Sequence, residues 1–117
     1  MVTERRKASD AAFRAIADPT RREILGLLRG GPQTVGALAS NFRTSRPAIS
    51  KHLRLLRSAG LVSSRKAGAT HVCHLNAEPL RVVDTWLQDY EVFWRQNLRS
   101  LKNYIETAGE RQKEKNR

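Results

Sequence analysis

The stretch SRPAISKHLRLLRSAGLV, residues 45–62, decides the fold of this chain. Pro47 fits only the first turn of a helix, because a residue there has no carbonyl one turn earlier to which its N–H group would donate a hydrogen bond. The sequence therefore predicts a helix over residues 45–59 that is capped by Thr44 or Ser45 and stopped by Gly60. One side of this helix is apolar at helical spacing and is expected to be buried, through Ile49, Leu53 and Leu56.

A shorter helix is predicted just before it. Thr34 is the expected cap, and apolar residues follow at helical spacing, namely Val35, Leu38, Ala39 and Phe42. A tight turn over residues 41–44 joins the two helices. Two short helices joined by a tight turn, the second richer in basic residues, are typical of a helix-turn-helix unit.

A β-hairpin is predicted directly after the second helix. Two short strands, around residues 61–62 and 72–75, flank the turn 66–69, which contains Gly68. A hairpin in this place defines the winged variant of the helix-turn-helix. The expected fold class is therefore mainly α with a small β-hairpin wing over residues 62–75.

The N-terminal part predicts two more helices. Asp18 and Pro19 form a helix start, and Gly30 to Pro32 stop that helix. Ser9 is the expected cap of a short helix before it, whose buried side would be Ala12, Phe13 and Ile16. Residues 1–8 are expected to be a flexible basic N-terminus.

The longest predicted helix covers residues 79–108, starting at Pro79. Its apolar residues step by threes and fours in one stripe, which consists of Leu80, Val83, Trp86, Leu87, Tyr90, Phe93, Trp94, Leu98, Leu101 and Ile105. Thirty residues at 1.5 Å each span about 45 Å, which is longer than a domain of this size is wide. The far half of the stripe thus has no expected cover within its own chain. One domain over residues 9–108 and a disordered polar tail over residues 109–117 complete the expected organisation.

The charge of the chain favours a polyanionic partner. The net charge is +11, and no Asp or Glu occurs between Glu23 and Glu78, where eight Lys and Arg residues lie. A solvated face normally carries both signs of charge. Double-stranded DNA is the expected partner.

The helix over residues 45–59 supplies most of the expected DNA contacts. Its side opposite the apolar stripe is predicted to carry Arg46, Pro47, Ser50, Lys51, Arg54 and Arg57. In helix-turn-helix docking the first turn of this helix meets base edges in the major groove. Arg46 suits guanine, Ser50 suits either base, and Pro47 suits a thymine methyl group.

Phosphate contacts are expected around these base contacts. They come from Lys51, Arg54 and the hydroxyl groups of Thr44 and Ser45. Near the wing tip, Arg65 and Lys66 are expected to reach flanking DNA. His52 lies at the edge of the apolar side and is predicted to pack within the protein.

The soft metal ligands of the chain do not predict a metal site. On a strand, His71 and Cys73 share one face while His74 lies on the other, so the three side chains do not converge. No metal and no cofactor are therefore expected. Cys73 as a sensor of oxidants stays open as an alternative.

Four segments together resemble the ArsR-type winged-helix repressors: ADPTRREIL, TVGALASNF, SRPAISKHLRLLRSAGLV and PLRVVDTWL, which occur in the family's order over about residues 10–105. The resemblance implies a homodimer that binds operator DNA, with an interface between the first and last helices. On this chain the interface would include Phe13, Ile16, Leu87, Tyr90, Phe93, Trp94, Leu98, Leu101 and Ile105. Many such relatives repress their own operon and release DNA when an inducer binds, which leaves room for a small-molecule inducer.

Metal-sensing relatives place cysteines at the start of the third helix, or carboxylate and histidine pairs in the last helix. Here the early positions hold Thr34 and Gly36, and residues 79–108 contain no histidine. The resemblance is therefore to the branch that does not sense metals, which is consistent with the absence of an expected metal site.

The sequence predicts a cytoplasmic, homodimeric repressor that binds a palindromic operator, without contact to a membrane. No catalytic group with a paired base and no phosphate-binding glycine loop is recognisable, so an enzyme is not expected. Two alternatives stay open: a regulator that acts through protein contacts of the long aromatic helix, and a nonspecific, nucleoid-type DNA binder. The aromatic residues of that helix, such as Trp86 and Tyr90, also leave open a ligand pocket between two long helices.

Overall fold

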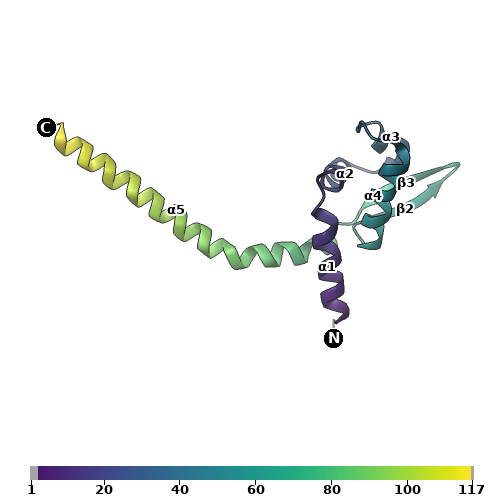
Figure 1. Ribbon diagram of the computed structural model, residues 1–117, viewed down its shortest axis with the longest axis horizontal. Helices are drawn as coiled ribbons and strands as arrows, with labels where there is room; N and C mark the ends of the chain where they lie inside the picture. The colour runs from purple at the N-terminus through teal and green to yellow at the C-terminus, as the bar shows by residue number, and fades with distance from the viewer. Residues whose placement is uncertain (1–2, 117) are drawn as a thin grey trace. The chain divides into compact units, whose positions relative to one another are not determined.

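The computed structural model describes residues 3–116, in two compact units that meet between Val83 and Asp84. The elements follow in the order α1 (Glu4–Ile16), α2 (Pro19–Arg29), β1 (Gln33–Thr34), α3 (Val35–Ala39), α4 (Arg46–Ser58), β2 (Val62–Ala67), β3 (Thr70–Leu75), the 3-10 helix η1 (Glu78–Leu80) and α5 (Arg81–Lys115) (Figure 1). The predicted class, mainly helical with a small hairpin wing, is confirmed.

The core of the first unit lies between the helices and the base of the hairpin. The predicted apolar side of α4 is confirmed, since Ile49, Leu53 and Leu56 are completely buried. They pack in one cluster with Leu38 of α3 and Cys73 of β3. This cluster holds α4 against α3 and the sheet. The surface of α4 that stays outside the core therefore has a defined orientation relative to the wing.

The sheet has three strands in the order β1-β3-β2, all antiparallel. The hairpin of β2 and β3 reaches beyond the helices of this unit, as Figure 1 shows. Its turn is tighter than the predicted one: Ala67 pairs with Thr70, and Gly68 has a φ of +64°, a conformation that favours glycine. The short strand β1 was not predicted, because two residues carry no alternation pattern.

Helix α1 begins earlier than the sequence predicted. Its cap is Thr3, whose hydroxyl accepts a hydrogen bond from the Arg6 N–H at 3.1 Å, and Glu4 occupies the first turn. Ser9 is therefore not a cap, and residues 4–8 are helical rather than flexible. A capping threonine followed by an acidic residue is a helix start in its own right. Residues 1 and 2 of the predicted flexible segment lie outside the described residues.

The C-terminal helix also differs from the predicted one at both ends. Pro79 lies in η1, where the Asn76 side chain accepts a hydrogen bond from the Glu78 N–H at 3.2 Å, and α5 begins only at Arg81. At the other end α5 continues to Lys115, so most of the tail expected to be disordered is helical. Residues 110–115 are all good helix formers, and basic residues suit the last turn. Residue 117 lies outside the described part.

Helix α3 ends at Ala39 rather than at Phe42. The side chains of Ser40 and Asn41 donate hydrogen bonds to the carbonyl of Ala37, at 2.7 and 2.9 Å. Such local bonds compete with the continuation of a helix. The turn between α3 and α4 is correspondingly longer than predicted.

Candidate nucleic-acid interface

The start of α4 is built by two residues. Ser45 is the cap, with extended backbone angles and a side chain that accepts a hydrogen bond from the Ala48 N–H at 3.3 Å. Pro47 lies in the first turn, as predicted. Of the two predicted caps Ser45 is correct, while Thr44 lies exposed in the preceding turn. The first turn of α4 is thus rigid and open to solvent.

The residues of α4 that the sequence places opposite the apolar stripe follow two rows on the helix surface. Pro47, Lys51 and Arg54 recur at helical spacing, are exposed and form the outer row. Arg46, Ser50 and Arg57 follow a second line nearer the buried stripe, which we call the wing-side row. The predicted residues divide in this way because 100° per residue separates Arg46 from Pro47.

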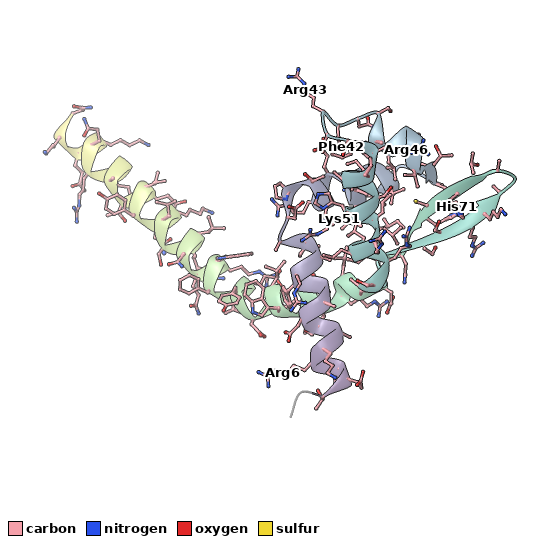
Figure 2. The ribbon with its side chains drawn as sticks, turned by 45° about the vertical axis from the view of Figure 1, so that its right-hand side comes forward. Arg6, Phe42, Arg43, Arg46, Lys51 and His71 are labelled. Carbon is pink, nitrogen blue, oxygen red and sulfur yellow. The ribbon has the colours of Figure 1, made fainter. Side chains whose placement is uncertain are left out.

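Two observations place the wing-side row beside the hairpin. Arg57 lies close enough to Cys73 of β3 to lower the pKa of that thiol, against the larger opposing effect of burial. Arg46 lines a hollow together with Thr70 and His71 of β3. Figure 2 shows Arg46 at the start of α4 and His71 on the wing.

The side chain of Arg46 lies across the start of α3. Its Nη2 atom is 3.8 Å from the position that a Cβ atom would take at Gly36. That separation is an ordinary van der Waals distance, so the guanidinium group lies beside Gly36. In this arrangement Arg46 is directed toward α3 and the wing, whereas a guanine contact would require it to extend.

The part of the chain that contains both rows is strongly basic. Eight basic residues lie between Glu23 and Glu78: Arg29, Arg43, Arg46, Lys51, Arg54, Arg57, Arg65 and Lys66. All eight are exposed, and within residues 3–116 none of them forms an ion pair with a carboxylate. Unpaired basic side chains of this density suit a phosphate backbone. Arg65 and Lys66 lie in the outer half of β2, near the wing tip, as predicted.

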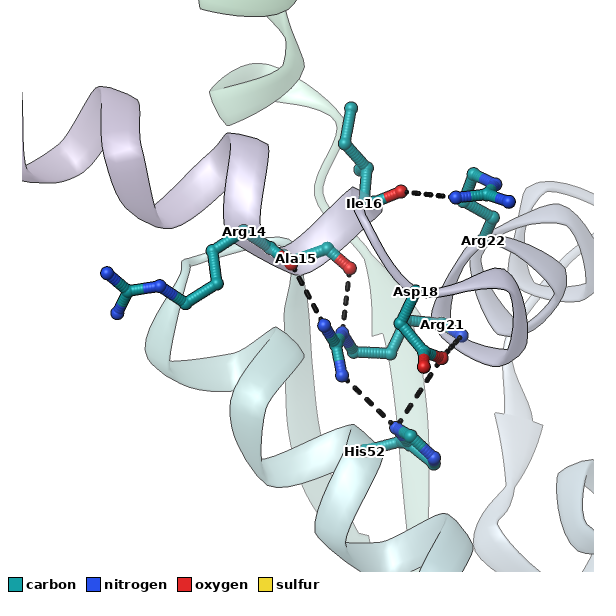
Figure 3. A network of polar contacts seen from close by, with 7 residues as sticks. All are labelled: Arg14, Ala15, Ile16, Asp18, Arg21, Arg22 and His52. Atoms are coloured by element: carbon teal, nitrogen blue, oxygen red, sulfur yellow. Dashed lines mark hydrogen bonds and ion pairs between the residues drawn. The ribbon is translucent and has the colours of Figure 1, made fainter.

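His52 lies on the inner edge of α4, as predicted, within a polar network (Figure 3). Its Nδ1 atom is 3.4 Å from Arg21 Nη1 and 3.8 Å from Asp18 Oδ2. Asp18 also caps α2, because its carboxylate accepts a hydrogen bond from the Arg21 N–H at 3.0 Å. That backbone bond is the main reason why the pKa of Asp18 is lowered, and the nearby His52 and the Arg21 side chain contribute.

Arg21 and Arg22 bind the C-terminal end of α1 in the same network. The sequence did not reveal this function for either residue. Arg21 donates to the carbonyl groups of Ala15 and Arg14 at 2.8 and 2.9 Å, and Arg22 donates to that of Ile16 at 2.8 Å. Carbonyl groups in the last turn of a helix lack the usual partner four residues later, although that of Arg14 also accepts from the Ala17 N–H at 3.3 Å. One guanidinium group thus connects α1, the start of α2 and, through His52, the helix α4. Arginine next to a helix cap carries no sequence signal for such contacts.

Cys73 is completely buried, and burial raises the pKa of its thiol. A buried thiol with a raised pKa is a poor nucleophile, which weakens the alternative of an oxidant sensor. Among the residues that the structure describes, no three His, Cys, Asp or Glu side chains are grouped to hold a metal ion.

The second unit is the helix α5 from Asp84 onward, and its apolar stripe is open. Large side chains are exposed along it: Trp86, Leu87, Tyr90, Val92, Phe93, Trp94, Leu98, Leu101, Tyr104 and Ile105. Trp86 and Tyr90 contact each other, with ring centroids 5.1 Å apart. An apolar area of this extent marks an interaction surface. Of the interface residues expected on α1, Phe13 is half-buried, and Ile16 packs partly against the core.

In the described residues no helix combines the length and hydropathy that crossing a membrane requires.

Comparison with known proteins gives consistent matches. The family described as "Bacterial regulatory protein, arsR family" matches residues 18–64. The HTH-type transcriptional regulator Rv2034 of Mycobacterium tuberculosis is 38% identical, over 89% of this chain and 94% of its own length. The transcriptional repressor SdpR of Bacillus subtilis is 41% identical, over 67% of this chain and 87% of its own length. A solved ArsR family transcriptional regulator, RHA00566, superposes with a TM-score of 0.69 at 35% identity, covering 81% of this chain and 97% of that one.

Proposed function

The chain belongs to the ArsR family of bacterial regulatory proteins, and from this membership we propose that it is a homodimeric repressor that binds operator DNA. The observation that carries the proposal is the outer row of α4. It offers two exposed basic groups, Lys51 and Arg54, behind the first turn that Ser45 and Pro47 fix, on a helix that carries no carboxylate. A DNA-binding regulator of this kind acts in the cytoplasm, and no enzymatic activity is part of the proposal.

In the proposed complex the first turn of α4 enters the major groove. Arg46, Ser50 and Pro47 read bases, and Arg46 extends from its position beside Gly36 to reach guanine. Phosphate groups are bound by Lys51, Arg54, Arg57 and the hydroxyl groups of Thr44 and Ser45. The hydroxyl oxygen of Ser45 accepts the capping bond, so its O–H is free to donate. Arg65 and Lys66 reach flanking DNA from the wing.

The exposed stripe of α5 is the proposed dimer interface, together with Phe13 and Ile16 of α1. A monomer would leave side chains such as Phe93 and Leu98 more than half exposed, at 59% and 65%. A second copy offers the same stripe and covers both. A symmetric dimer places two α4 helices about 34 Å apart on one side of the duplex, so the operator should be an imperfect palindrome.

Selection of genomic fragments with the purified full chain tests this function. We expect enrichment of a palindromic site. Arg46→Ala should weaken binding to that site by about 1–3 kcal/mol and relax base preference at one position of each half-site. Arg54→Gln should weaken binding to all DNA sequences. It should also reduce the slope of log K against log salt concentration by about one.

A matched control is Arg29→Gln, because Arg29 is also exposed but lies at the end of α2. It should change the affinity much less than Arg54→Gln. Binding without any enriched site would favour the nucleoid-type alternative. A monomer that binds no DNA would favour a regulator that acts through protein partners.

A further inference from the structure

A hollow of about 260 Å³ lies between the start of α3, the start of α4 and the wing. It is lined by Thr34, Val35, Gly36, Arg46, Ala69, Thr70 and His71. A second, wider hollow continues it, because Val35 and His71 line both, and this one adds Arg57 and Ser64. The two hollows follow the wing-side row of α4. The first hollow is just below the lower limit of about 300 Å³ for ligand pockets, which suits a small group, and the second has a volume of about 490 Å³.

The polar groups of this hollow are hydrogen-bond donors without an acidic partner. A guanidinium group has five N–H donors. In the part of the chain that the structure describes, the side chain of Arg46 makes no hydrogen bond and no ion pair. The hydroxyl of Thr34 accepts from the Ala37 N–H at 3.1 Å, so its own proton is free for a further acceptor.

The surroundings favour an anion over a neutral ligand. No carboxylate occurs between Glu23 and Glu78, and Arg57 is the other charged group that lines the hollows. An arginine with several unsatisfied donors binds the oxygens of a phosphate in the two-pronged geometry that lysine cannot offer. His71 on the wing supplies a further donor, whereas the Thr70 hydroxyl already donates to the carbonyl of Ala67 at 2.9 Å.

We propose that this hollow binds the phosphate group of a free small molecule, which thereby holds Arg46 against the wing and away from the operator. The effect on DNA rests on the proposed repressor function. One guanidinium group cannot grip a phosphate beside Gly36 and a guanine in the major groove at the same time. Occupation of the hollow therefore lowers operator affinity, and the phosphate ester acts as an inducer. A backbone phosphate of DNA offers the same chemistry, and the experiments separate the two sources.

The first experiment contains no DNA, so it is independent of the repressor proposal. Inorganic phosphate is titrated into the ¹⁵N-labelled full chain, with chloride at equal ionic strength as reference. We expect saturable shifts of the amide signals of Gly36, Thr70 and His71. Arg46→Gln and His71→Ala should each weaken phosphate binding about tenfold or more.

His74→Ala is the matched control, since His74 lies on the opposite face of the same strand. It should leave phosphate binding unchanged. Shifts that do not saturate, or that are the same in Arg46→Gln and in the unchanged protein, would overturn the site.

The second experiment uses the DNA fragment that the protein selects, at constant ionic strength. Inorganic phosphate should lower the affinity of the unchanged protein and of His74→Ala. His71→Ala should bind DNA normally in chloride and should no longer respond to phosphate. The opposite result is that His71→Ala binds DNA more weakly in chloride, with a slope of log K against log salt concentration that is smaller by about one. In that case the hollow binds a phosphate of the DNA backbone, and the proposal of a small-molecule inducer is refuted.

Discussion

Helices α4 and α5 have the same kind of sequence pattern but differ in what covers their apolar side. In α4, Ile49, Leu53 and Leu56 have no exposed surface, because α2, α3 and the sheet of the same unit enclose them. In α5, the large apolar side chains are between 38% and 72% exposed. An amphipathic pattern thus specifies a helix and a side that needs cover, but it does not specify which chain supplies the cover.

The largest expected effect concerns the buried apolar side of α4. Leu53→Ala removes a completely buried side chain and leaves a cavity, which should lower the free energy of unfolding by about 2–5 kcal/mol. Urea denaturation of the full chain at two protein concentrations measures it. The loss should be the same at both concentrations, because the cavity lies within one chain. Leu55→Ala, at a half-buried position of the same helix, should cost less. Equal losses for both variants would contradict a core centred on Leu53.

The second-largest expected effect concerns the exposed apolar side of α5. Leu98→Asp places a charge in the proposed interface, and burial of an unpaired carboxylate is costly. We expect the dissociation constant of the dimer to rise about 100-fold or more, which corresponds to roughly 2.7 kcal/mol. Sedimentation equilibrium over a range of concentrations measures it.

Ser100→Asp is the control for that variant, because Ser100 lies on the polar side of α5. It should leave the dissociation constant nearly unchanged. A Leu98→Asp protein that stays as dimeric as the control would show that α5 is covered by something other than a second copy.

The smallest effect lies at the edge of the covered side, where Asp18 and His52 meet. Asn caps a helix as well as Asp does, so Asp18→Asn removes the charge and keeps the cap, whereas Asp18→Ala should cost about 0.5–2 kcal/mol. Because the pKa of Asp18 is lowered, its charge stabilises the fold above the ordinary carboxyl pKa of about 3.9, and this contribution is lost as the pH falls through the folded value. The difference between Asp18 and Asn should be present at pH 7 and disappear in acid. Urea denaturation at both pH values tests this, and an equal difference at both would refute the assignment.

Most of the first unit could be predicted from local signals. The caps Asp18, Thr34 and Ser45, and the stop at Gly30, act through short-range hydrogen bonds and backbone preferences, and each has a sequence signature. The early start of α1 was missed although it has such a signature in Thr3. The wing turn was placed by Gly68, but its length depends on the strand register, which is set by pairing across the hairpin.

The candidate interface was predictable in composition and less so in geometry. Periodicity identified the residues of α4 that stay outside the core, and charge identified the class of partner. Arg46 lies beside Gly36, ten residues earlier in the chain, and no local pattern indicates this proximity. The contacts of Arg21 with α1 and His52 likewise join segments that no periodicity connects. Those residues therefore remained unassigned until the structure placed them.

The burial of the single cysteine has a practical consequence for labelling experiments. Cys73 is completely shielded, and its thiol stays protonated more readily than an exposed one. The thiolate is the nucleophile that attacks a thiol-specific reagent, so a cysteine introduced on the exposed surface would react first. Spin labels or fluorophores can thus be attached at chosen positions of α5 without replacing Cys73. Distances between two labelled copies would then report directly whether the long helices lie parallel or antiparallel.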